Sequence, residues 1–104
     1  MILTTIEVVP DKKIVAHFGI VTGSTVRSKH FGRDLFAGLK NIIGGELKAY
    51  TELMEETRDE ATERMIAQAT KLGANAVIGI RFASSDVAPG AAEVFAYGTA
   101  VKVE

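Results

Sequence analysis

The two histidines, His17 and His30, are the side chains of this sequence best suited to bind a metal ion. They lie thirteen residues apart, and neither has a histidine partner three or four positions away. A structural zinc site takes four clustered N or S ligands and a catalytic site takes three plus water, so one subunit does not supply a complete set. We therefore expect a divalent transition metal only where copies of His17 converge on the axis of a symmetric oligomer. The alternative is a strand histidine whose ring is hydrogen-bonded to a neighbour.

The absence of cysteine excludes several kinds of metal site and catalytic site. With no thiol in the chain, disulfides, zinc–thiolate sites and cysteine nucleophiles are all excluded. Serines are present, but no Gly-x-Ser-x-Gly elbow surrounds any of them. We predict no catalytic residue, no bound organic cofactor and no enzymatic activity.

Two charged regions are candidate binding surfaces. A basic cluster comprises Arg27, Lys29, His30, Arg33 and Lys40. Residues 46–63 carry seven acidic and two basic side chains, with several carboxylates four residues apart. Such like-charge pairs are typical of a solvated helix face, although weak cation binding is an alternative. The basic cluster could bind a nucleotide, an RNA backbone or an acidic peptide, but we favour its packing against the acidic helix of a neighbouring subunit.

Gly44-Gly45 is a candidate phosphate-binding turn, because backbone N–H groups at the start of a helix attract anions. Glu46 follows directly and would place a negative charge beside the phosphate. The chain also lacks the Gly-Lys-Ser/Thr pattern of a phosphate-binding loop. We interpret the glycine pair as a turn between two helices.

The size and composition indicate one domain, residues 1–104. Apolar residues make up 47% of the chain and the net charge is −1, so no overall charge favours nucleic acid or an acidic membrane surface. The N-terminus has no basic region followed by an apolar run, and no apolar stretch reaches the ~20 residues that a membrane span needs. We expect a cytoplasmic protein.

The hydrophobic pattern predicts an α+β fold in the order β-β-α-α-β-β, with two helices on one face of a largely antiparallel sheet. We expect strands at 2–8, 14–26, 75–84 and 93–103. Helices are expected over 32–43 and 46–72, and the longer one should end at Gly73. Residues 9–12 and 85–90 should form turns, and Gly19 and Gly23 indicate a bulge or bend in the second strand.

Both faces of the predicted strands are mostly small or apolar. Strict alternation puts Val77, Gly79 and Arg81 on one face of their strand, and Ala76, Ile78, Ile80 and Phe82 on the other. It likewise puts Phe18 and Ile20 opposite His17 and Val21. In the last strand it puts Val94, Ala96, Gly98 and Ala100 opposite Phe95, Tyr97, Thr99, Val101 and Val103. A single layer of helices covers only one face, and exposing the other would forfeit many kcal/mol at ~25 cal/mol per Å² of apolar area. We therefore expect a homo-oligomer, unless the assignment of faces is displaced by one residue.

Several segments resemble the YbjQ family. They are 19–23 (GIVTG), 36–45 (FAGLKNIIGG) followed by Tyr50, 72–82 (LGANAVIGIRF) and 98–101 (GTAV). The resemblance implies a dodecin-like subunit in a ring-shaped homo-oligomer, with a pentamer favoured. It also carries an old label of heavy-metal binding.

The chain departs from the family pattern at three places. Phe18 stands where some relatives have cysteine, and Ala83 stands where an aspartate often follows the strand. Both changes weaken a metal site. Glu46-Leu47 replaces an arginine-containing stretch, which weakens anion binding. We expect a non-enzymatic scaffold that binds a small molecule or a partner, and the alternative is a metal-binding protein with its site at the oligomer axis or interface.

Overall fold

The computed structural model describes residues 1–27, 42–43, 46–88 and 91–104. In chain order its elements are β1 (Ile2–Leu3), β2 (Ile14–Arg27), β3 (Ile42–Ile43), β4 (Glu46–Leu47), α2 (Lys48–Lys71), β5 (Ala76–Ala88) and β6 (Ala91–Val103). Within these ranges no helix is long and apolar enough to cross a membrane.

The main sheet has four strands in the order β1-β5-β6-β2. β2 and β5 each pair antiparallel with β6, whereas the short β1 runs parallel to β5. β3 and β4 form a separate two-stranded ladder just before α2. The α+β class and the mainly antiparallel sheet are therefore confirmed.

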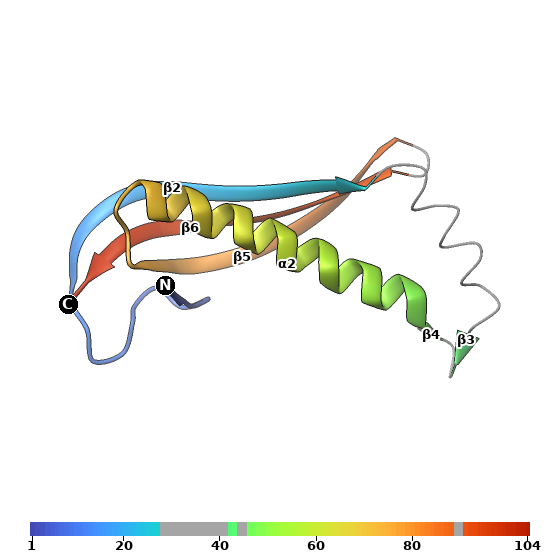
Figure 1. Cartoon of the computed structure of the whole chain (residues 1–104). Coiled ribbons are helices and arrows are strands. Elements are labelled where there is room, and N and C mark those ends of the chain that lie inside the picture. The colour runs from blue at the N-terminus through green and yellow to red at the C-terminus, as the bar shows by residue number, and fades with distance from the viewer. Residues whose placement is uncertain (28–41, 44–45, 89–90) are drawn as a thin grey trace.

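One described helix, α2, packs on this sheet (Figure 1). It ends at Lys71, and Gly73 just beyond it has a φ of 89°, the left-handed conformation that commonly terminates helices. The predicted helix over 32–43 lies mostly outside the described residues, and its last two residues form β3. Residues 46–47, predicted to begin the long helix, form β4 instead. Two helices on one face are thus not confirmed.

The core between α2 and the sheet is built from small side chains. Ala61, Met65 and Ala69 of α2 are completely buried against Val21 of β2 and Ala96 of β6. At Gly23 the backbones of helix and strand meet directly. A Cβ there would overlap the Ala61 carbonyl oxygen and the Met65 amide nitrogen, and would lie 3.0 Å from the Arg64 carbonyl carbon. Gly23 is therefore a point of close approach, and the strand register around it is regular rather than bulged.

Two bulges do interrupt the strands, at Gly19 and Gly79. Both glycines have positive φ, 94° and 62°, and the register shifts between His17 and Gly19 and between Ile78 and Arg81. Each extra residue displaces the alternation by one position. The bulge at Gly19 confirms the prediction there, whereas the strict alternation predicted for both strands is wrong.

The displaced alternation changes which residues share a face. Phe18 packs with Val21 under the helix, and Ile80 joins Val77 in the same cluster. Only the last strand keeps the predicted arrangement, with Ala96 and Ala100 under the helix and Val101 and Val103 on the opposite face.

The N-terminal segment covers part of the opposite face. Val9, helped by Ile2, packs on Ala76, Ile78, Val101 and Val103 in a second small core. Residues 4–6 continue along the edge of β5, where the amides of Ile80 and Gly79 donate hydrogen bonds to the carbonyls of Thr4 and Ile6. The predicted strand over 2–8 is therefore only two residues long. The predicted turn is present, since the Lys12 amide donates to the Val9 carbonyl and Asp11 has a φ of 64°.

Candidate functional site

The part of the sheet that neither α2 nor the N-terminal segment covers is the main candidate for a binding surface. The strand register places its members on the face opposite the helix. We call this set the open sheet face: Ile20, Thr22, Ser24 and Val26 of β2, Glu93, Phe95, Tyr97 and Thr99 of β6, and Arg81 and Ala83 of β5.

Large apolar side chains on the open sheet face are exposed to solvent. Ile20 is 77% exposed, Val26 54% and Tyr97 38%. Phe95 lies beside Tyr97 with ring centroids 5.7 Å apart and the rings tilted by 31°. Single exposed apolar residues are common on protein surfaces, but several gathered on one flat face mark an interaction site.

Arg81 is held at the border of this face. Its guanidinium donates hydrogen bonds of 2.8 Å to the carbonyl of Thr5 and to that of Ile80. The contact with Thr5 ties the N-terminal segment to β5, so the boundary between the covered and uncovered parts of the sheet is fixed by Arg81.

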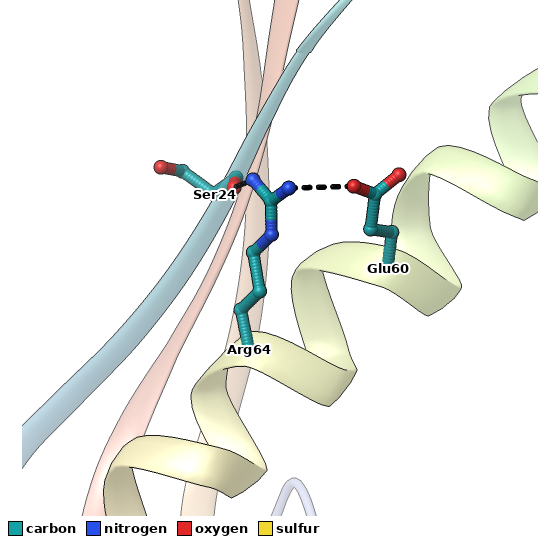
Figure 2. A network of polar contacts seen from close by, with 3 residues as sticks. All are labelled: Ser24, Glu60 and Arg64. Carbon is teal, nitrogen blue, oxygen red and sulfur yellow. Dashed lines mark hydrogen bonds and ion pairs between the residues drawn. The ribbon is translucent and has the colours of Figure 1, made fainter.

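The outer edge of β2 is partly occupied by side chains from α2. Gln68 Oε1 accepts a 2.7 Å hydrogen bond from the Thr22 amide, and Arg64 donates a 2.5 Å bond to the Ser24 carbonyl. Figure 2 shows Arg64 between Ser24 and Glu60, whose carboxylate accepts a 2.6 Å bond from the second guanidinium nitrogen. These contacts use backbone groups that would otherwise pair with an added strand. Association at residues 22–24 is therefore favoured through the face rather than through the edge.

His17 lies at one end of β2, opposite Val101 of β6, and its side chain is exposed. Across the described ranges, no three His, Asp or Glu side chains come together in a way that could hold a metal ion. His30 falls outside those ranges. The structure of one chain thus places His17 at the surface without bringing further ligands to it.

The other predicted charged features lie only partly within the described residues. In the acidic segment, Glu52, Glu55, Glu56, Asp59 and Glu63 are exposed, and Glu60 is engaged by Arg64. Of the basic cluster, Arg27 ends β2, while residues 29, 30, 33 and 40 lie outside the described residues, as does Gly44-Gly45. The helix face predicted to be solvated is indeed exposed at these five positions.

The sequence-based prediction missed the two side chains on the β2 edge and the true composition of the open sheet face. No periodic signal marks Arg64 or Gln68, because both lie on a polar helix surface. Gly19 does carry a sequence signal for the composition of the open sheet face, because a bulge at Gly19 places Ile20 on the opposite face of the sheet from Phe18.

Comparison with known proteins places the chain in a family. A model of the YbjQ family, described as "Putative heavy-metal-binding", matches residues 1–104. The chain belongs to the YbjQ family. A UPF0145 protein of Hahella chejuensis is 65% identical over 104 residues, covering all of both chains, and one of Archaeoglobus fulgidus is 52% identical over 99% of this chain and 95% of its own. Both relatives carry the family name UPF0145 alone.

A solved structure supports the fold. A protein of unknown function from Pediococcus pentosaceus, assigned to the DUF74 family, superimposes with a TM-score of 0.66 over 100% of this chain and 98% of its own. Its sequence identity is 18%, so the similarity extends to the fold alone. The family match over residues 1–104 and the relatives at 65% and 52% identity confirm the resemblance of the sequence to the YbjQ family.

Proposed function

We propose that this YbjQ-family protein is a cytoplasmic, non-enzymatic scaffold that binds a small molecule or a partner and assembles into a ring of identical subunits, with five copies favoured and a dodecin-like arrangement. The observation that carries the proposal is the exposure of Ile20, Val26 and Tyr97 on the open sheet face. A second copy of the chain is the partner with suitable chemistry, because the uncovered surface carries exposed apolar side chains among polar ones and a second copy offers the same mixture.

The strength of such an interface can be estimated from one residue. Complete burial of an isoleucine stabilises by about 1.5–3 kcal/mol, so covering the 77% of Ile20 that is exposed contributes about 1–2 kcal/mol per subunit. A lysine at that position would lose this term and would bring an unpaired charge into the contact.

The test compares Ile20→Lys with Leu72→Lys by sedimentation velocity of the full chain at micromolar concentration. Leu72 is a matched control, because it is also a large exposed residue, 45% exposed, but lies at the end of α2. Ile20→Lys should shift the population toward single chains, whereas Leu72→Lys should sediment like the original protein. Equal behaviour of the two variants would contradict the proposal.

The second candidate function is binding of a divalent transition metal by several copies of His17 in the assembled ring. It is supported by the family description and by the exposure of His17 on β2. Titration of zinc, nickel and copper into the tag-free protein and its His17→Ala variant, followed by calorimetry, tests it. The proposal requires that His17→Ala abolish binding, and identical isotherms would rule this site out.

A further inference from the structure

A cavity lies beside α2, and most of the strand residues that line it are on the side of the sheet that α2 covers. Its volume is about 200 Å³, and it is lined by Met54, Arg58, Phe82, Ala83, Ser84 and Val94. An enclosed apolar cavity of ~150 Å³ accommodates benzene, and this one is of similar size but open to solvent on one side. The space beside α2 is thus suited to a single ring or branched chain carrying one small polar group.

The lining of this cavity combines apolar side chains with one cation, Arg58. Val94 is 3% exposed, whereas Phe82 is 48% exposed. Arg58 is an exposed residue on α2, and it forms no ion pair with any residue in the described part of the chain. An unpaired guanidinium beside an exposed aromatic ring favours a ligand with both a carboxylate and an apolar body.

The strand side of the cavity carries two hydroxyl groups in one row, and only one of them lines the cavity. Thr25, Val94 and Ser84 form one row across β2, β6 and β5, on the face that α2 covers. Thr25 is 4% exposed, and its hydroxyl has no hydrogen-bond partner within the described residues. Buried hydroxyl groups are rarely left without a partner, but Thr25 does not line the cavity and its oxygen is closed to solvent, so the Ser84 hydroxyl at the other end of the row is the group that can reach a ligand.

We propose that this cavity binds a small aromatic or branched carboxylate. Arg58 binds the carboxylate through paired N–H donors, and the Ser84 hydroxyl donates a further hydrogen bond. Phe82, Met54 and Val94 contact the apolar body, with the ring of the ligand offset against Phe82. The proposal names a ligand class for the small-molecule role of the scaffold and rests on that role, but it does not depend on ring assembly, because every lining residue belongs to one chain.

The experiment uses the full chain and fluorine NMR of two probes, 4-fluorobenzoate and 4-fluorobenzyl alcohol. The probes have the same ring and differ in charge. The benzoate should bind about tenfold more tightly than the alcohol, which is a fold-change typical of one charge-assisted hydrogen-bonded pair. Equal affinities, or no line broadening of either probe at millimolar concentration, would overturn the proposal.

Three variants locate the site. Arg58→Gln should lower the affinity for the benzoate to that for the alcohol, and Phe82→Ala should weaken both probes. Lys71→Gln is the matched control, since it removes a cation near the opposite end of α2 and should change neither affinity. If Lys71→Gln weakens the benzoate as much as Arg58→Gln does, the attraction is unspecific and the proposal fails.

Folding and assembly are followed in the same samples. Circular dichroism checks that each variant is folded. Arg58→Gln is the decisive variant for benzoate binding, because an exposed helix position tolerates glutamine without loss of folding. Light scattering reports the subunit number independently. Loss of the ring with retained benzoate binding would contradict only the assembly, and an intact ring without benzoate binding would contradict only the cavity.

Discussion

Replacement of Gly23 by alanine tests the packing of α2 on β2, on which the described fold depends. The added methyl group would overlap the backbone at Ala61 and Met65, and backbone atoms cannot move aside as the end of a flexible side chain does. The helix would have to move away from the strand by an appreciable fraction of an ångström. We therefore expect a large loss of stability from one methyl group.

The size of the loss follows from the neighbouring contacts. Overpacking a core costs about 1–3 kcal/mol when side chains can adjust. A gap of 0.5–1 Å forfeits a quarter to a half of each van der Waals contact, and Ala61, Met65 and Ala69 are all completely buried in the same layer. We estimate a loss of about 3 kcal/mol, which is a large fraction of the 5–15 kcal/mol typical of a whole domain.

Urea unfolding at fixed protein concentration measures this loss. Asp59→Glu is the control, since it adds one methylene group at an exposed position of α2 and should change the free energy of unfolding by less than about 0.5 kcal/mol. A loss below about 1 kcal/mol for Gly23→Ala would refute the close approach of helix and strand.

Three further perturbations have defined outcomes. Asn75→Ala removes two hydrogen bonds, of 2.8 and 2.9 Å, between the Asn75 side chain and the backbone of Val103. The free energy of unfolding should fall by about 1–3 kcal/mol, and hydrogen exchange at the Val103 amide should become faster. Unchanged exchange would contradict this role. Arg64→Gln removes an exposed ion pair and frees the Ser24 carbonyl. The free energy of unfolding should fall by less than about 1 kcal/mol, whereas turbidity on heating should increase because the edge of β2 can then pair with another chain. A variant that stays as clear as the original protein would show that the β2 edge needs no protection. Asp11→Gly relieves a positive φ and should raise the thermal midpoint by a few degrees, whereas a lower midpoint would argue against the turn.

Much of the fold could be predicted because the strands and the long helix carry clear patterns. The alternation of Ala96, Gly98 and Ala100 with Tyr97 and Thr99 predicted both faces of β6 correctly, since no bulge interrupts that strand. The stop of α2 at Gly73 was also predictable, because glycine adopts the left-handed conformation without steric cost.

The composition of the open sheet face could not be obtained from alternation alone. A bulge adds one residue to one strand, and its effect on all later residues depends on pairing with a distant partner, which a single strand does not encode. Gly19 and Gly79 are visible in the sequence, but Gly23 looks the same and serves a different purpose. The N-terminal cover over Val101 and Val103 was missed for a related reason, since Val9 lies in a turn and carries no periodic signal.

The cavity beside Phe82 was likewise beyond the reach of sequence patterns. Its lining residues come from α2, β5 and β6, and they meet only because the helix crosses the row formed by Ser84 and Val94. Arg58 in particular looks like one more charge on a solvated helix until the position of Phe82 is known.

The central claim is that the open sheet face is covered by further copies of this chain. Native mass spectrometry of the tag-free protein at micromolar concentration tests it most directly, because it counts subunits. The account predicts a dominant species of five times the mass of the chain, which dissociates when Ile20 is replaced by lysine. A dominant species with the mass of a single chain would contradict it.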